Sequence, residues 1–339
     1  MSSRNFDKER PVENISTTTG YCSDPTIGNS LEEVEEEDRW TDLQLASRDG
    51  DLPTIERLLL DPSTNINAPP VGWYGQNALQ AACAQGHIPV VKRLIAAGAD
   101  VNAAGDFNRP RTALQIASVS GNDQIVDMLL AAGAEVNVPA AKYNGRTALQ
   151  AASEGGHLPV IEKLLTIGAD VNAPGAHYGG LTALQASCSP ASNITVVRTL
   201  LAAGAGVNAP PSRYFGLTAL QNASLHGHLD IVNELLNHGA DVNAPGAYNG
   251  GGTALLAAAE CGYAEIVMIL LDAGADVEVI SGQKKQTALQ AAAANGHREA
   301  FILLEDAEEE ANSKKRDRRL SAVLNSRWRS GTDGIIIQD

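Results

Sequence analysis

The chain has 339 residues, a formal net charge of −15 and only 4% aromatic residues. Ala and Leu supply most of the apolar residues, which favours the stacking of small-residue helices over a bulky central core. The negative charge disfavours a general affinity for nucleic acid or for anionic membrane surfaces and makes a basic partner the better expectation.

The cysteine pattern and the hydropathy indicate an intracellular protein. The four cysteines are Cys22, Cys83, Cys188 and Cys261, and none belongs to a Cys-x-x-Cys pair or has a His at zinc-ligand spacing. We therefore expect reduced thiols. Because there is no N-terminal apolar region and no apolar run approaching about 18 residues, we expect neither secretion nor a membrane span.

Residues 1–40 are polar and end in the acidic run Glu32 to Asp38. Such a segment buries too little apolar area to offset its ordering entropy, so we predict a disordered acidic N-terminal segment. Two interpretations of the acidic run stay open: a solvated tail, or a docking site for a basic partner.

A periodic region follows from residue 41. Its units open on a Thr or Asn, and these residues are spaced by 34 to 36 positions: Thr41, Asn77, Thr112, Thr147, Thr182, Thr218, Thr253 and Thr287. A period in this range is typical of a solenoid, in which each unit buries its apolar face against its neighbours. The length is therefore interpreted as one elongated repeat domain, 41–304.

The unit that opens at Thr147 predicts two short helices. Thr147 is a plausible N-cap for the first helix, and Gly155-Gly156 ends it. The second helix carries Pro159 in its first turn, where a missing N–H costs little, and Gly168 follows its end. Its predicted buried residues are Val160, Ile161, Leu164 and Leu165.

These residues resemble the ankyrin repeat family, whose units read roughly Gly-x-Thr-Pro-Leu-His-x-Ala-Ala, Gly-His, Leu-Leu and Gly-Ala-Asp-Val-Asn. The resemblance covers residues 41–304, or seven full units and a shortened eighth. It implies an all-α solenoid of stacked helix-turn-helix units with projecting loops or short hairpins, which we call fingers. It also implies a non-catalytic protein-interaction module that presents a concave surface.

Two departures from the family pattern matter. The Pro-His of the motif is Ala-Gln here, as at Ala148 and Gln150, and the Gln side chain is able to bridge neighbouring loops. The connection from each Asn to the next Thr is also lengthened. Asn137 to Thr147 is ten residues, about two more than in the usual family unit. The fingers are therefore expected to be longer.

The fingers hold most of the aromatic residues. They contain eight of the fourteen Phe, Trp and Tyr, with basic residues beside them. Rows of exposed aromatic and Arg side chains are typical of binding hot spots. The alternative, that each ring packs on the next finger and stiffens it, stays open. The predicted partner-binding residues are Trp73, Tyr74, Phe107, Tyr143, Tyr178, Tyr214, Phe215, Tyr248, Arg146 and Arg213.

Residues 305–339 are predicted to form a charged, partly disordered C-terminal tail. The cluster Lys314 to Arg319 resembles a nuclear import signal, although basic clusters are common in such tails. Arg318-Arg319-Leu320-Ser321 resembles a site for basic-directed kinases, which makes Ser321 a candidate phosphorylation site. Apolar residues from Leu320 to Trp328 fall at helical spacing, so this piece is able to dock as a helix.

The chain carries no pattern that predicts catalysis, a metal site or a cofactor. One His recurs at a shared turn position, as His87, His157, His228 and His297, and this regularity favours a structural hydrogen bond over metal ligation. The sequence has no nucleophile elbow, phosphate-binding loop or dinucleotide-binding turn.

We therefore expect a monomeric, non-catalytic scaffold or recognition module in the cytoplasm, which binds a protein partner. The alternative is a nuclear regulator that masks a basic partner such as a transcription factor, favoured by the net charge and by Lys314 to Arg319. A third hypothesis, a detached sensor portion of a larger receptor or enzyme, is disfavoured by the capped character of both ends of the array.

Overall fold

The computed structural model describes residues 40–70, 75–105, 111–142, 145–213, 216–247 and 251–330, with side chains as far as Ala322. Within these ranges the chain forms sixteen helices and no sheet, which confirms the all-α prediction. An isolated antiparallel bridge joins Ser281 and Gln286. Apart from Trp40, the N-terminal segment predicted to be disordered lies outside the described residues.

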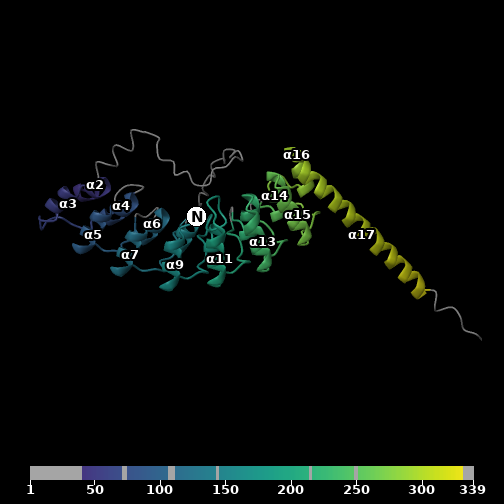
Figure 1. Cartoon of the computed structure of the whole chain (residues 1–339), viewed down its shortest axis with the longest axis horizontal. Coiled ribbons are helices and arrows are strands. Elements are labelled where there is room, and N and C mark those ends of the chain that lie inside the picture. The colour runs from purple at the N-terminus through teal and green to yellow at the C-terminus, as the bar shows by residue number, and fades with distance from the viewer. Residues whose placement is uncertain are drawn as a thin grey trace, which may run out of the picture. The chain divides into compact units, whose positions relative to one another are not determined.

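The helices come in pairs, and each pair is one repeat. The first helices are α2 (Asp42–Asp49), α4 (Ala78–Gln85), α6 (Ala113–Ser120), α8 (Ala148–Glu154), α10 (Ala183–Ala186), α12 (Ala219–Leu225), α14 (Ala254–Cys261) and α16 (Ala288–Asn295). The second helices are α3 (Leu52–Leu58), α5 (Ile88–Ala96), α7 (Asp123–Ala131), α9 (Leu158–Thr166), α11 (Ile194–Ala202), α13 (Leu229–Asn237), α15 (Ala264–Asp272) and α17 (Arg298–Ser330). Each repeat packs on the next, and Figure 1 shows the second helices following one another along the array.

A capping box starts the first helix of most repeats. In α8 the Thr147 hydroxyl accepts a hydrogen bond from the Gln150 backbone N–H (3.2 Å), and the Gln150 Oε1 accepts one from the Thr147 N–H (3.0 Å). These bonds satisfy amides that a helix start otherwise leaves without partners. The predicted N-cap at Thr147 is confirmed, and the helix ends before Gly155 and Gly156, as expected.

The second helix supplies the larger apolar side chains. In α9 the N-cap is His157, Pro159 lies in the first turn, and Val160, Ile161 and Leu164 are buried. Leu165, also predicted to be buried, is only partly covered. With the buried Leu and Ala residues of the first helices, these side chains form one apolar cluster from Leu43 to Leu304. Helices of seven to nine residues are too short to persist alone, so this shared core holds them.

The repeat that opens at Thr182 has an irregular turn between its two helices, where Ser189 to Asn193 stand in place of the Gly-His of other repeats. Its first helix, α10, has only four residues. The turn that follows is closed by Ser192, whose hydroxyl donates to the backbone carbonyls of Ser187 (2.8 Å) and Ser189. Asn193 then caps α11 by accepting from the Thr195 N–H at 2.9 Å. Ser and Asn side chains therefore close the inter-helix turn of this repeat.

A ladder of asparagines joins successive repeats at the loop after the second helix. Asn137 Nδ2 donates to the Gly168 carbonyl at 3.0 Å, and Asn137 Oδ1 accepts from the Asp170 N–H at 2.8 Å. Asp170 in turn accepts from the Asn172 N–H at 2.9 Å, so the repeated Asp bonds within its own loop. The Asn residues that bond in this way are Asn67, Asn102, Asn137, Asn172, Asn208 and Asn243.

A second ladder uses the Gln that departs from the family motif. Besides capping its own helix, Gln150 donates from Nε2 to the carbonyls of Ala173 (2.9 Å) and Pro174 (3.1 Å) in the finger ahead. This bridge to a neighbouring loop is the one expected from the sequence. Equivalent bridges to the finger ahead come from Gln44, Gln80, Gln115, Gln185 and Gln221.

The recurring His residues form a third ladder. His157 Nε2 bonds the Val119 carbonyl of the preceding repeat at 3.0 Å, and its ring lies over Gly121. A Cβ at Gly121 would come within 2.3 Å of the ring, and the φ of +66° there also favours glycine. His87, His228 and His297 make the same kind of bond to a preceding repeat. The structural role predicted for these four histidines is therefore confirmed.

The last helix, α17, is much longer than the others. It has 33 residues and does not stop at Leu304, where the sequence places the end of the repeat domain. Its first part packs against α15 and α16, and Figure 1 shows the remainder running on beyond them. The segment has no Gly or Pro from Arg298 to Ser330 and is rich in Ala, Glu, Lys and Arg, which are good helix formers.

Candidate protein-binding surface

The structure describes only some of the predicted partner-binding residues. Three of them, Tyr178, Arg146 and Arg213, fall within the part of the chain that the structure describes. The predictions for the other seven lie outside the described residues: Trp73, Tyr74, Phe107, Tyr143, Tyr214, Phe215 and Tyr248.

Tyr178 lies in the finger that precedes α10. Its backbone N–H donates to the Lys142 carbonyl of the preceding finger at 3.4 Å, so the two fingers are joined. Its ring stands edge-on to His177, with centroids 4.9 Å apart and planes at 81°. The side chain is half-buried, which leaves part of the ring open to a partner. Packing and binding therefore remain compatible roles for this tyrosine.

Arg146 precedes the N-cap of α8 and forms a two-pronged ion pair with Glu154 at the other end of that helix. Nε lies 2.9 Å and Nη2 3.3 Å from the two carboxylate oxygens, and Nη1 donates to the Gly145 carbonyl at 3.1 Å. The side chains are 14% and 26% exposed. A bidentate pair of this kind fixes both side chains, so α8 presents an ordered charged feature. Arg213, in the next finger but one, is exposed.

The face of the first helices beside the fingers varies between repeats, whereas the ladder positions repeat. In the second to eighth repeats the seventh residue after the N-cap is at least partly exposed: Ala84, Val119, Glu154, Ser189, Leu225, Glu260 and Ala294. The residue before the N-cap varies too: Gln76, Arg111, Arg146, Leu181, Leu217, Gly252 and Gln286. Of these positions, sequence reasoning named Arg146 and Arg111 as basic residues beside the finger aromatics and Ser189 as part of an irregular turn. It did not single out the others, although differences between otherwise matching repeats are the signal that finds them.

The described cysteines are free, and none has an activating environment. Burial raises the pKa of the Cys83 and Cys188 thiols to about 12. The pKa of Cys261 is also raised, first by burial and then by the nearby Glu260 carboxylate. Nucleophilic chemistry needs a thiolate, so these environments favour the unreactive thiol at neutral pH.

The close pair His226 and His228 does not gather further ligands. Their rings lie 6.1 Å apart, and burial, then the neighbouring His228, lowers the pKa of His226. Over the described ranges no group of three or more His, Cys, Asp or Glu side chains is placed to hold a metal ion. In the same ranges no helix is long and apolar enough to cross a membrane.

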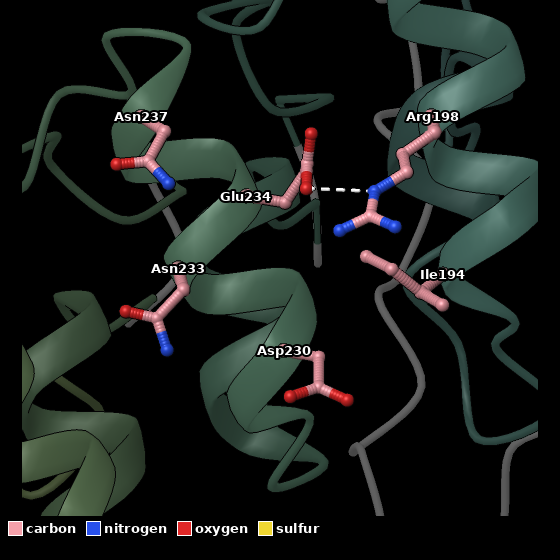
Figure 2. A pocket seen from close by; sticks show the side chains of 6 residues that line it. All are labelled: Ile194, Arg198, Asp230, Asn233, Glu234 and Asn237. Carbon is pink, nitrogen blue, oxygen red and sulfur yellow. Dashed lines mark hydrogen bonds and ion pairs between the residues drawn. The ribbon is translucent and has the colours of Figure 1, made fainter.

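A shallow hollow of about 360 Å³ lies between two of the second helices, α11 and α13. Figure 2 shows Arg198 of α11 reaching across it to Glu234 of α13, at 2.8 Å between Nε and Oε2. The remaining lining is mostly polar and includes Asp230, Asn233 and Asn237. An open polar hollow between two outer helices offers little to a small ligand, which usually needs an enclosed apolar pocket.

The repeats, their capping boxes and the three ladders define a class of protein, a solenoid of paired short helices. The family model for ankyrin repeats in three copies matches residues 26–105, 43–140, 105–175, 175–246 and 245–317, so the chain belongs to the ankyrin repeat family. No individual curated protein matches the sequence closely enough to compare. Ankyrin repeats generally mediate protein–protein interactions and are typically non-catalytic.

Proposed function

We propose that this protein is a non-catalytic recognition module that presents its fingers and the adjoining face of the first helices to a protein partner. The observation that carries the proposal is the contrast between constant and variable positions. The Asn, Gln and His ladders repeat along the array, while the exposed residues beside the fingers differ from one repeat to the next. Constant bonds support a rigid framework, and variable side chains supply specificity.

A rigid surface lowers the cost of binding. Gln side chains of the first six repeats bond the finger ahead, and a His or Tyr ring of the next repeat covers the inter-helix turns at Gly50, Gly121, Gly227 and Gly262. Little of this surface therefore needs to be ordered when a partner arrives. The fixed pair of Arg146 and Glu154, with exposed Val119 in the repeat before it, supports a contact area of mixed chemistry. Aromatic residues in the fingers are suitable anchors for such an area.

Replacing Tyr143, Tyr178 and Tyr214 together with Ala should weaken partner capture at least about tenfold, because aromatic hot spots each contribute about 2 kcal/mol or more. Capture on the immobilised full chain, with quantitative mass spectrometry, identifies the protein retained by the wild type. Its Kd for each variant is then measured. The thermal unfolding midpoint should stay within a few degrees of wild type, because the sequence places these tyrosines in the connections between repeats and not at the apolar positions of the helices.

The matched control changes three exposed residues on the outer helices, Arg198, Asn233 and Asn237, to Ala. This variant should bind like the wild type. Equal loss of binding in both variants, or a large drop in the unfolding temperature of the tyrosine variant, would show that the fingers serve folding and not recognition.

A second candidate function is nuclear regulation by masking a basic partner, supported by the net charge of −15 and by the basic cluster 314–319 on α17. Within the cluster, Lys314 pairs with Glu310 and Lys315 with Glu278, while Arg316, Arg318 and Arg319 are exposed. Ser321, the proposed phosphorylation site, is exposed one turn further along the helix. Phosphate there would offset part of the positive charge.

If the cluster directs nuclear import, changing Arg316, Arg318 and Arg319 to Gln should shift a tagged chain from nucleus to cytoplasm in imaged cells. Substitution is preferable to deletion from residue 311, because Ala311 packs against the solenoid core. Changing the exposed Lys284 and Lys285 to Gln removes charge elsewhere and should leave the distribution unchanged. A wild-type chain confined to the cytoplasm removes the main support for this second function.

A further inference from the structure

The far part of α17 offers an uncovered helical surface. Ala300, Leu304, Ala307 and Ala311 pack against the solenoid core, and the last ion pair toward it joins Lys315 to Glu278. Every described side chain from Asn312 to Ala322 is exposed. At a rise of about 1.5 Å per residue, the residues from Asn312 to Ala322 carry the helix more than about 15 Å past its docked part. Figure 1 shows α17 running on beyond α15 and α16.

The charges along α17 are complementary to those of a second α17 that runs antiparallel to it. Residues 305–310 hold five acidic side chains, and residues 314–319 hold five basic ones. Counting outward from Asn312 in both directions, each of the five acidic positions meets a basic one. The exchanged pairs are Glu305 with Arg319, Asp306 with Arg318, Glu308 with Arg316, Glu309 with Lys315, and Glu310 with Lys314. Two identical helices placed antiparallel about Asn312 would bring opposite charges together.

One side of the helix carries this symmetry as a continuous stripe. Glu305, Glu308, Asn312, Arg316 and Arg319 are separated by three or four residues, so they lie on one side of an α-helix. Four of them are exposed and Glu308 is half-buried. The stripe is a different side from the one that packs on the solenoid, and it uses neither of the lysines that already have partners within the chain.

The isolated helix does not satisfy the charges of the stripe. Glu305 and Glu308 are neighbours on the helix surface, as are Arg316 and Arg319, and like charges at this spacing repel. Reversal would also bring Ile302 of one helix within about one turn of Leu320 of the other. These two apolar side chains are 44% and 65% exposed. A second copy would therefore relieve repulsion and cover apolar surface.

We propose that two copies of this chain associate through an antiparallel pairing of their α17 helices. Glu305 of one copy faces Arg319 of the other, Glu308 faces Arg316, and the two Asn312 side chains meet on the twofold axis. Each ion pair occurs twice, as a twofold interface requires. The pairing replaces the monomer expected from the sequence. Because exposed ion pairs contribute little individually, the association is weak and sensitive to salt.

Sedimentation of the full chain tests the pairing. At about 0.15 M NaCl the apparent mass should rise from 35.4 kDa towards twice that value as the concentration increases from about 5 to 200 μM. At about 1 M NaCl it should return to 35.4 kDa, because that ionic strength screens exposed charges beyond about 3 Å. A mass that stays at 35.4 kDa under both conditions overturns the proposal.

Charge reversal separates pairing from a structural effect. One variant carries Glu305→Arg and Glu308→Arg, and another carries Arg316→Glu and Arg319→Glu. Each alone should remain monomeric at 200 μM, about the top of the concentration range, because every cross-helix contact would then join like charges. An equimolar mixture should pair, because all four contacts become opposite again.

A chain that carries all four reversals should self-associate like the wild type, and circular dichroism should show equal helix content in every variant. If each double variant still dimerises alone, or if the mixture and the fourfold variant stay monomeric while their helix content is intact, the α17 stripe does not form the interface.

Discussion

Replacing Gln150 with Ala should lower the free energy of unfolding by about 3 kcal/mol, because it leaves several buried polar groups without partners. The side chain is 1% exposed. Its Oε1 accepts from the Thr147 N–H, and its Nε2 donates to the carbonyls of Ala173 and Pro174. The substitution removes one bond of the capping box and, at the same time, both side-chain bonds to the next finger. Urea unfolding followed by circular dichroism measures the change.

Gln290 provides the matched control. It makes the same capping box with Thr287, but it is exposed, and its bonds are made within its own helix start. Gln290→Ala should therefore cost about 1 kcal/mol, the usual value of a lost cap. Equal losses for the two substitutions would mean that the bridge to the finger adds nothing to stability.

In the seventh repeat other bonds take the place of those made by this Gln. Leu256 stands at that position, and the finger there is rebuilt: Ser281 and Gln286 form an antiparallel bridge, and the Thr253 N–H donates to Ser281 Oγ at 3.3 Å. Losing the bridge is therefore compatible with the fold where the finger supplies its own bonds. The finger ahead of Gln150 has backbone bonds from Gly180 to Ala176 and from Tyr178 to Lys142, but neither of them replaces the donors that Gln150 gives to Ala173 and Pro174. Gln150→Ala therefore leaves these carbonyls and the Thr147 N–H without a side-chain partner.

Leu164→Ala should destabilise the protein by about 3 kcal/mol, within the range measured for large-to-small changes in packed cores. Leu164 is 0% exposed and lies at the centre of α9, within the apolar cluster that links the repeats. Removing it costs transfer energy and leaves a cavity between α9 and its neighbours. Because repeats unfold with their neighbours, the urea midpoint should fall, and the slope should decrease if the array splits there.

Ile167, three residues further along, is the control. It is 48% exposed and caps the end of α9, so Ile167→Ala should change the free energy of unfolding by less than about 0.5 kcal/mol. An effect as large as that of Leu164→Ala would mean that the outer side of this helix is covered in solution, and would contradict the burial pattern described above.

The sequence alone determined the elements that depend on neighbours close in the chain. Thr147 predicts its own helix start, because the capping box closes over three residues. The glycines after the two helices of this repeat and the positions of Val160, Ile161 and Leu164 follow from backbone preference and helical spacing. The recurrence of His at one turn position in four repeats predicted that these side chains make structural hydrogen bonds.

Tertiary structure decided how the polar side chains are shared between repeats. The sequence suggested that Gln150 is able to bridge loops, but its acceptors lie more than twenty residues further along the chain. Only the stacking of repeats shows which carbonyls the side chain reaches. The pairing of Arg146 with Glu154 was likewise hidden, because two turns of α8 separate them and only the folded finger brings the guanidinium back over the helix. Beyond Leu304 the sequence predicted a charged, partly disordered tail, with helical spacing only from Leu320 to Trp328, whereas the structure has one helix from Arg298 to Ser330. Docking on α15 starts this helix, and the helix propensity of its residues extends it.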